Sequence, residues 1–322
     1  MRVRIKAVWV GGFAVIAALT LTACGQIATL QARKAFKDAN ALYQQQDYNR
    51  AAAKYEEVVQ VVQSEAEPDP NLIAAYFYLG NSYDQLYRPS RKGEPANDEI
   101  LTKAINNYKL AVEREQSPQR KKLAMQYLVA SYGADKLNDP AQAEPVLLNM
   151  IELEPSDPAN YFVLSRIYED AGSYDQAEAM LVKAREAKPD DSVVYMQLAS
   201  YYNRQGEFDK TIEALQQRAQ REPDNPEAHY TIASYYWDEA FRDFRLKEDQ
   251  KRTYVDRGLN EVNQAIKIKP DYIEAITYKG LLLRLQANME RNPDRQRALL
   301  REAEELQGQA KELQKKKAAG VS

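Results

Sequence analysis

The sequence predicts an all-α fold, an array of antiparallel helix pairs, on the strength of three observations. The stretch FVLSRIYEDAGSYDQAEAMLVKAREAKP, from Phe162 to Pro189, recurs 34 residues later as MQLASYYNRQGEFDKTIEALQQRAQREP. The composition suits helices, since 28% of the residues are charged and only 12 of the 322 are glycine. A chain of this length forms either two ordinary domains or one array of repeats, and the recurring stretch favours the array.

Each copy of the stretch reads as two helices joined by a tight turn. Tyr161, Leu164 and Tyr168 share one helical face, and Gly172 ends that helix. A second apolar series follows, and Pro189 ends the second helix. The sequence therefore predicts an antiparallel pair of about four turns each.

Residues before the predicted helices indicate where these begin. Asp157 and Asn225 each precede a proline at the first helical position, which is a typical capping arrangement. Asn71 and Ser192 are expected to cap two further helices in the same way.

The pattern can be phased as seven units after residue 31. They span 32–64, 73–117, 124–155, 158–189, 192–223, 226–270 and 273–307, followed by a capping helix and basic tail over 308–322. Small residues are expected where the two helices of a unit cross. On the first helices these are Ala39, Gly80, Ser131, Ser165, Ala199, Ala233 and Gly280. On the second helices they are Ala51, Ala104, Ala143, Ala177, Thr211, Gly258 and Ala298.

This spacing of large residue, Leu, small residue, Tyr, Ala and Pro over 34 residues resembles the tetratricopeptide repeat. The resemblance implies a right-handed superhelical solenoid that binds other proteins in a concave groove lined by the first helix of each unit. The fifth position of each unit and nearby polar positions are the candidate groove residues. They are Phe36, Asn40, Phe77, Asn81, Leu128, Phe162, Arg166, Met196, Tyr230 and Ser234. An apolar ladder beside amides suits a peptide. The alternative is that these side chains pack against neighbouring helices.

Three longer connections interrupt the pattern, at residues 87–99, 240–255 and 288–297. Phe241, Phe244 and Tyr254 are aromatic residues within the charged second insertion, and we predict that they contact a partner along the edge of the array. The alternative is a simple extension of the helices into solvent, because turns tolerate added length.

The first 23 residues differ from the rest. Three basic residues precede an apolar run, as in a secretory signal peptide. Leu21-Thr22-Ala23-Cys24 resembles the lipobox of bacterial lipoproteins, which implies cleavage before Cys24 and attachment of a lipid to the only cysteine of the chain. Residues 24–31 would then form a tether. A plain membrane anchor is the alternative. The absence of aspartate after Cys24 implies, by the same resemblance, an outer-membrane lipoprotein facing the periplasm.

Several function classes are disfavoured. The formal net charge of −3 provides no basic surface for nucleic acid. The single histidine, His229, occupies a large-residue position and is expected to pack in the core. No Cys-His metal spacing, phosphate loop or Ser-His-Asp set is present, so we expect no enzyme activity, cofactor, metal or small-molecule substrate.

The resulting hypothesis is a lipid-anchored envelope scaffold that binds a protein partner and supports the assembly of a membrane or secretion complex. An adaptor that presents substrates to an envelope hydrolase or protease is the alternative.

Overall fold

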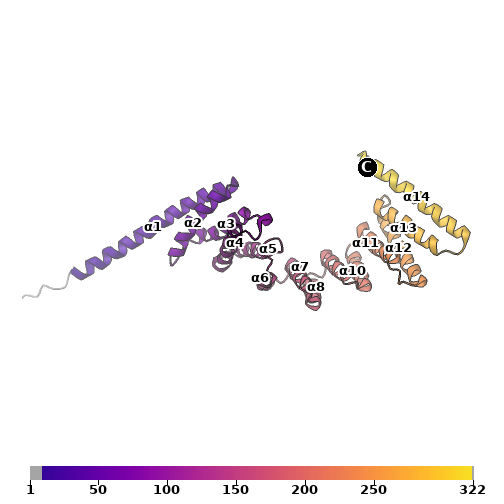
Figure 1. Ribbon diagram of the computed structural model, residues 1–322, viewed down its shortest axis with the longest axis horizontal. Helices are drawn as coiled ribbons and strands as arrows, with labels where there is room; N and C mark the ends of the chain where they lie inside the picture. Colours follow the sequence, from indigo (N-terminus) through magenta and orange to yellow (C-terminus); the bar gives the residue numbers. More distant parts are fainter. Residues whose placement is uncertain (1–8, 321–322) are drawn as a thin grey trace, which may run out of the picture. The chain divides into compact units, whose positions relative to one another are not determined.

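The computed structural model describes residues 9–320, with side chains from Gln26 onward, as helices and short connections. Within residues 9–320 there is no β-strand, in agreement with the predicted fold class. Figure 1 shows the helices following one another as hairpins. The chain divides into two compact units, the N-terminal unit up to Pro155 and the C-terminal unit from Ser156.

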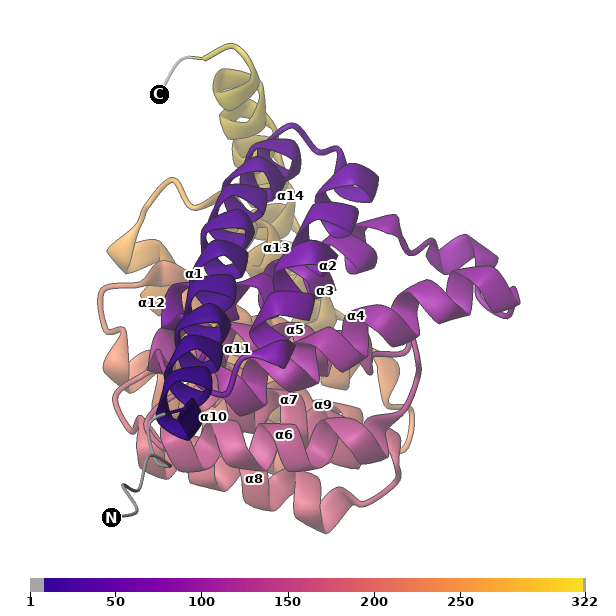
Figure 2. The same ribbon diagram turned by 90° about the vertical axis from the view of Figure 1, so that its left-hand side faces the viewer.

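The N-terminal unit contains three consecutive helix pairs. Its helices are α1 (Trp9–Gln44), α2 (Tyr48–Ser64), α3 (Pro70–Leu86), α4 (Pro95–Arg114), α5 (Pro118–Ser131) and α6 (Pro140–Leu153). Each helix packs against the next along the chain, and α1 also contacts α3 (Figure 2). Residues 24–31, expected as a tether, belong to α1, in which the Thr29 hydroxyl donates to Glu65 of the α2–α3 connection at 2.7 Å.

The C-terminal unit contains four pairs. Its helices are α7 (Pro158–Asp170), α8 (Tyr174–Ala187), α9 (Ser192–Arg204), α10 (Phe208–Arg221), α11 (Pro226–Arg242), α12 (Glu248–Ile268), α13 (Ile273–Met289) and α14 (Pro293–Ala318). Gly172 and Gly206 occupy the tight turns at φ values of +74° and +73°, which residues other than glycine rarely adopt. These turns therefore follow the prediction.

Tyrosines fill much of both cores. Tyr55, Tyr76 and Tyr108 are fully buried in the N-terminal unit, as are Tyr195 and Tyr236 in the C-terminal one. Several tyrosine hydroxyls bond between helices, as when Tyr55 of α2 donates to the side-chain oxygen of Asn40 on α1 at 2.6 Å. A phenol thus supplies apolar volume and a hydrogen bond between helices, which explains the use of 22 tyrosines against 7 phenylalanines.

Two predicted caps are correct and two are wrong. Asp157 and Asn225 accept hydrogen bonds from backbone amides two residues ahead. For α3 and α9, however, the cap is the preceding aspartate, Asp69 in one case and Asp191 in the other. Asn71 and Ser192 already lie inside the first helical turn, where a side chain cannot accept from the amides ahead.

The last pair also differs from the prediction. Residues 308–318 are not a separate capping helix, because α14 runs unbroken from Pro293 to Ala318. Ala298 is exposed, and Ala303 takes the close crossing with its carbonyl oxygen 3.3 Å from where a Cβ on Gly280 would lie. The crossing has shifted by five residues along α14, since a longer second helix can slide on the first.

The insertions are largely absorbed into helices. α11 has 17 residues and α12 has 21, whereas the corresponding α9 and α10 have 13 and 14. The sixth pair therefore follows the alternative interpretation of helix extension. The insertion at 87–99 keeps a loop with one 3₁₀ turn, and the side chain of Asn97 bonds to Arg88 and Arg91 within it.

Candidate protein-binding surface

In the N-terminal unit, the predicted groove residues belong to a cluster of aromatic rings. Phe36 of α1 contacts Tyr55 and Tyr78, with ring centroids 5.9 and 6.3 Å apart. Phe77 of α3 meets Tyr127 of α5 edge to face at 5.3 Å. Both phenylalanines are half-buried and present only part of each ring to solvent. Leu128 is 3% exposed and lies in the core.

The two asparagines of this unit are used by the fold. Asn81 is 1% exposed; its side-chain oxygen accepts from the Tyr43 hydroxyl at 2.6 Å, and its amide donates to the Tyr108 hydroxyl at 3.3 Å. Asn40 accepts from the Tyr55 hydroxyl at 2.6 Å and remains half-buried. In this structure Asn81 holds tyrosines together, and Asn40 retains only partial access to solvent.

Three predicted residues lie on α7 and α9 of the C-terminal unit. Phe162 and Met196 are half-buried, and the Met196 sulfur accepts from the Arg218 guanidinium at 3.0 Å. Arg166 is exposed and pairs with Glu169 at 3.4 Å and with Asp170 at 3.1 Å. The guanidinium of Arg166 is thus available at the surface but partly neutralised by its own helix.

A second group of aromatic rings lies on α11 and at the beginning of α13. Tyr230 contacts Tyr272 and Tyr278 edge to face at 5.6 and 5.2 Å, and Tyr278 contacts Trp237 at 5.5 Å. Trp237 in turn stacks on Phe241 at 5.0 Å. We call these five residues the α11–α13 aromatic face. The four inner members are half-buried and Phe241 is 59% exposed, so the rings are fixed in position and still reach solvent.

The chemistry of this face is neutral. Burial raises the pKa of Tyr230 to about 12, so its hydroxyl stays protonated at neutral pH. Ser234, predicted as a groove residue, lies one turn after Tyr230 and donates its hydroxyl to the Thr231 carbonyl at 2.7 Å. His229 is half-buried rather than fully packed, with Nδ1 2.7 Å from a Glu261 carboxylate oxygen on α12. The face can therefore offer aromatic contacts without a fixed charge.

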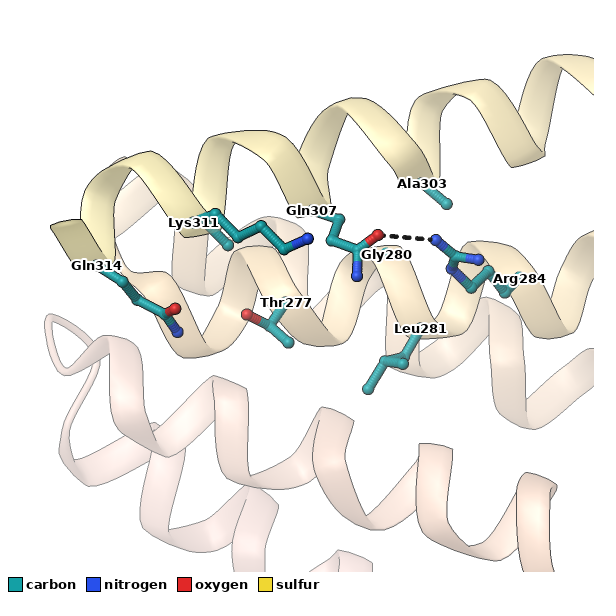
Figure 3. A pocket seen from close by; sticks show the side chains of 9 residues that line it. Thr277, Gly280, Leu281, Arg284, Ala303, Gln307, Lys311 and Gln314 are labelled. Atoms are coloured by element: carbon teal, nitrogen blue, oxygen red, sulfur yellow. Dashed lines mark hydrogen bonds between the residues drawn. The ribbon is translucent and has the colours of Figure 1, made fainter.

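A pocket of about 230 Å³ lies between α13 and α14 (Figure 3). Its lining residues are Thr277, Gly280, Leu281, Arg284, Ala303, Gln307, Ala310, Lys311 and Gln314. Arg284 and Gln307 point toward one another and bond at 3.3 Å. No carboxylate lines the pocket, so its polar groups are two cations, two amides and a hydroxyl.

Sequence reasoning missed Trp237, Tyr278 and Arg284. Trp237 lies seven residues after Tyr230, and Arg284 lies seven residues after Thr277, the fifth-position residue of the seventh unit. Each therefore repeats its predecessor's helical face two turns later. Extending the fifth-position ladder by seven residues would have found both. Tyr278 carries no such signal, since it is one residue beyond the fifth position.

The predicted edge residues fall in two different environments. Phe241 and Phe244 are 59% and 88% exposed beside the short α11–α12 connection. Tyr254 lies within α12 and packs against Phe208 at 5.0 Å and Tyr236 at 5.7 Å, so it is mostly part of the core. The structure brings Phe241 to the aromatic face but not Tyr254.

Cys24 lies outside the residues whose side chains are described. Among the helices as far as they are described, none combines the length and apolar content that crossing a membrane requires. Over the same described residues, no cluster of three or more His, Cys, Asp or Glu side chains is arranged to hold a metal ion.

Comparisons with known proteins agree with the geometry. Two family models described as tetratricopeptide repeat match, one over residues 136–201 and the other over residues 192–234. The C-terminal part of a TPR repeat-containing protein from Cytophaga hutchinsonii superposes with a TM-score of 0.53 at 12% identity, over 84% of this chain and 95% of that one. This likeness supports the fold alone.

Two further solved structures are similar at lower scores. A tetratricopeptide repeat protein from Parabacteroides merdae gives a TM-score of 0.46 at 14% identity, over 85% of this chain and 99% of that one. YrrB, described as a TPR protein with an unusual peptide-binding site, gives a TM-score of 0.40 at 20% identity, over 61% of this chain and 89% of that one. No curated protein matches the chain.

Proposed function

We propose that this chain, which tetratricopeptide-repeat family models match over residues 136–234, is a lipid-anchored scaffold of the bacterial cell envelope. It holds a protein partner through the first helices of its pairs and supports assembly of a membrane or secretion complex. Tetratricopeptide repeats are a protein-interaction fold, which supports the binding role.

The α11–α13 aromatic face is the observation that carries the binding role. Energetically dominant residues at protein interfaces are enriched in Trp, Tyr and Arg that are held rigidly before binding. Here Tyr230, Trp237 and Tyr278 support one another, and Phe241 extends the face into solvent. Arg284 adds a cation in the pocket between α13 and α14. A peptide segment with apolar side chains fits such a surface.

The anchoring rests on the sequence from Leu21 to Cys24 after a short apolar run. Two or more acyl chains hold a protein at a membrane where one chain would exchange. With Gly25 and Gln26 after the cysteine, we place the protein at the outer membrane, facing the periplasm. Fractionation of the native host tests this placement.

We propose that the protein binds its partner without transforming it, as tetratricopeptide repeats are generally a protein-interaction fold. An adaptor that delivers substrates to an envelope hydrolase or protease would use the same surface, and loss of the protein separates the two roles. Loss of a scaffold depletes its complex. Loss of an adaptor leaves complexes intact and prolongs the life of one envelope protein.

Lipid attachment and partner capture can be tested in one experiment. Cells expressing the full chain or its Cys24→Ser variant are labelled with an alkyne-tagged palmitate, and the protein is purified by an affinity tag at its C-terminus. We expect label and membrane fractionation only with Cys24. We also expect a co-purified protein that is lost in a Tyr230→Ala, Trp237→Ala double variant and retained in Tyr174→Ala, which alters an exposed tyrosine of α8. Label on Cys24→Ser, or equal capture by both variants, contradicts the proposal.

A further inference from the structure

The middle of α1, just after Cys24, carries two exposed aliphatic side chains that the core does not use. Ile27 and Leu30 are 57% and 63% exposed, although residues of this type are usually buried. Lys34 and Lys37 follow on the same side of the helix, since the spacing of three, four and three residues returns to one face. We call these four residues the α1 stripe.

The opposite side of α1 is committed to the fold. Ala32, Ala35 and Ala39 are buried against α2 and α3. Thr29 bonds to Glu65, and Arg33 pairs with Asp69 at 2.8 Å. These contacts fix the rotation of the helix, so the α1 stripe cannot turn inward.

The two lysines of the stripe are free to meet an anion. Among the described residues, none forms an ion pair or hydrogen bond with Lys34 or Lys37, whereas neighbouring Arg33 is occupied. Asp38 is exposed nearby and is the acidic residue that partly offsets them. The stripe is thus apolar toward the N-terminus of the chain and cationic further along.

We propose that the α1 stripe rests on an anionic phospholipid surface, an inference that depends on the proposed anchoring near Cys24. At a rise of about 1.5 Å per residue, Ile27 and Leu30 lie about 5–9 Å from Cys24 along the axis, and Lys34 and Lys37 about 15–20 Å. Interfacial helices bury their apolar side chains about 5–10 Å into the boundary between headgroups and acyl chains. The aliphatic pair enters that boundary, and the lysines reach lipid phosphates.

Two features favour a membrane over a second protein. Ile27 and Leu30 cannot by themselves provide the roughly 800 Å² that each partner buries in a standard protein interface. α1 also runs continuously through residues 24–31, so no flexible linker separates the stripe from the anchor. The N-terminal unit is therefore held at the membrane in a defined orientation.

The test uses the single cysteine of the chain. Residues 24–322, which retain all the packed side chains, are coupled through Cys24 to a maleimide phospholipid in vesicles that contain brominated lipid. With Trp237→Phe and Leu30→Trp, the only tryptophan reports the stripe. We expect strong bromine quenching on phosphatidylglycerol vesicles and weaker quenching on phosphatidylcholine alone.

Matched variants decide the outcome. Leu148 of α6 is 46% exposed in the same unit, and Leu148→Trp should stay unquenched. Adding Lys34→Gln and Lys37→Gln should reduce the quenching of Leu30→Trp to its phosphatidylcholine level, because each lysine adds about a fivefold preference for anionic lipid. Absent quenching at Leu30→Trp, or quenching unchanged by the lysine variants, overturns the inference. Neither result affects partner capture through Tyr230 and Trp237, which is scored separately.

Discussion

Tyr43 and Tyr108 meet at the side chain of Asn81, which joins α1, α3 and α4 in the N-terminal unit. Burial raises the pKa of both tyrosines above its usual value, so their hydroxyls remain neutral donors and acceptors. Tyr108 also lies 3.4 Å from Asp84, which Lys136 of the α5–α6 connection holds at 2.6 Å. This network ties three helix pairs together through polar groups.

We predict that Asn81→Ala destabilises the N-terminal unit by about 1–3 kcal/mol, because it leaves two buried hydroxyls without their shared partner. Asn107→Ala on α4 is the control, since its amide bonds only to Lys103 of the same helix. Urea unfolding followed by circular dichroism measures both. Equal losses for the two variants would contradict the role of Asn81.

Glu169 connects α7 to α9 and predicts a pH dependence. Its carboxylate accepts two bonds from Arg204, at 2.7 and 2.8 Å, and the hydrogen bonds from Arg204 are the main reason its pKa lies below the usual value. A lowered folded-state pKa adds stability above the unfolded pKa, near 4.3, and loses it as pH falls through the folded value.

The corresponding variant is Glu169→Gln. It should lower the urea midpoint at neutral pH and make less difference at acidic pH, because the native carboxylate protonates as the pH falls through its lowered pKa. Glu186→Gln, at an exposed position of α8, should leave the midpoint unchanged at both pH values. A constant effect of Glu169→Gln at both pH values would refute the assignment.

Some residues act through their neighbours in the sequence, and others act through residues far along the chain. Local signals such as Asp157 before a proline and Gly172 in a turn act over a few residues, so the sequence predicted them. The bonds of Asn81 depend on residues 38 and 27 positions away, and no local signal reports them. For this reason an asparagine on a first helix was equally consistent with binding a peptide and with holding tyrosines.

At the scale of elements, helix pairs depend on how closely their axes approach. A Cβ on Gly80 would lie 2.9 Å from the Tyr108 ring and 3.1 Å from the Ala104 carbonyl, so α3 and α4 cross with no room for a methyl group. Gly308, in the middle of α14, has nothing within 4 Å of the same position. Close packing therefore requires a glycine at position 80, whereas position 308 has room for a side chain.

Alanine substitutions separate these cases. We predict that Gly80→Ala destabilises the protein by about 1–3 kcal/mol through overpacking, despite the better helix propensity of alanine. Gly308→Ala should stabilise it by up to about 1 kcal/mol, because only propensity changes. Thermal and urea unfolding measure both signs. If both substitutions shift stability in the same direction, the close crossing at Gly80 is not a real constraint.

The last helix shows where pattern reasoning ends. The repeat predicted Ala298 at the crossing, whereas Ala303 and Ala310 are the residues of α14 that become buried. In an internal pair, neighbours on both sides fix the register, and at the end of the array one of those neighbours is missing. The alternation of small and large residues on α14 then permits more than one register.

At the scale of the molecule, periodicity was enough to predict an all-α array of pairs. The division at Pro155 was not foreseen, because the repeat spacing continues past it without a change. The binding surface was predicted in part. Tyr230 belongs to the α11–α13 aromatic face, and Trp237 repeats its helical position seven residues later, but the role of Tyr278 emerges only when α11 and α13 are packed together.

We predict that Trp237→Ala weakens partner binding at least tenfold, in the range of about 1.4 kcal/mol or more expected for a central aromatic residue. Phe244→Ala should change binding little, because that ring is 88% exposed and contacts none of the rings of the face. Isothermal titration calorimetry with the captured partner compares the affinities of the two variants. A larger loss from Phe244→Ala would move the site to the α11–α12 connection.

The most direct test of the account is photo-crosslinking in the native host. A photoreactive amino acid is placed at Phe77, Phe162 or Tyr230 on first helices, and at Phe244 or Tyr174 away from them, and the adducts are identified by mass spectrometry. We predict that Phe162 and Tyr230 trap the same envelope protein and that Tyr174 traps none. Adducts only from Phe244, or none from any first-helix position, would contradict the claim that the first helices hold a partner.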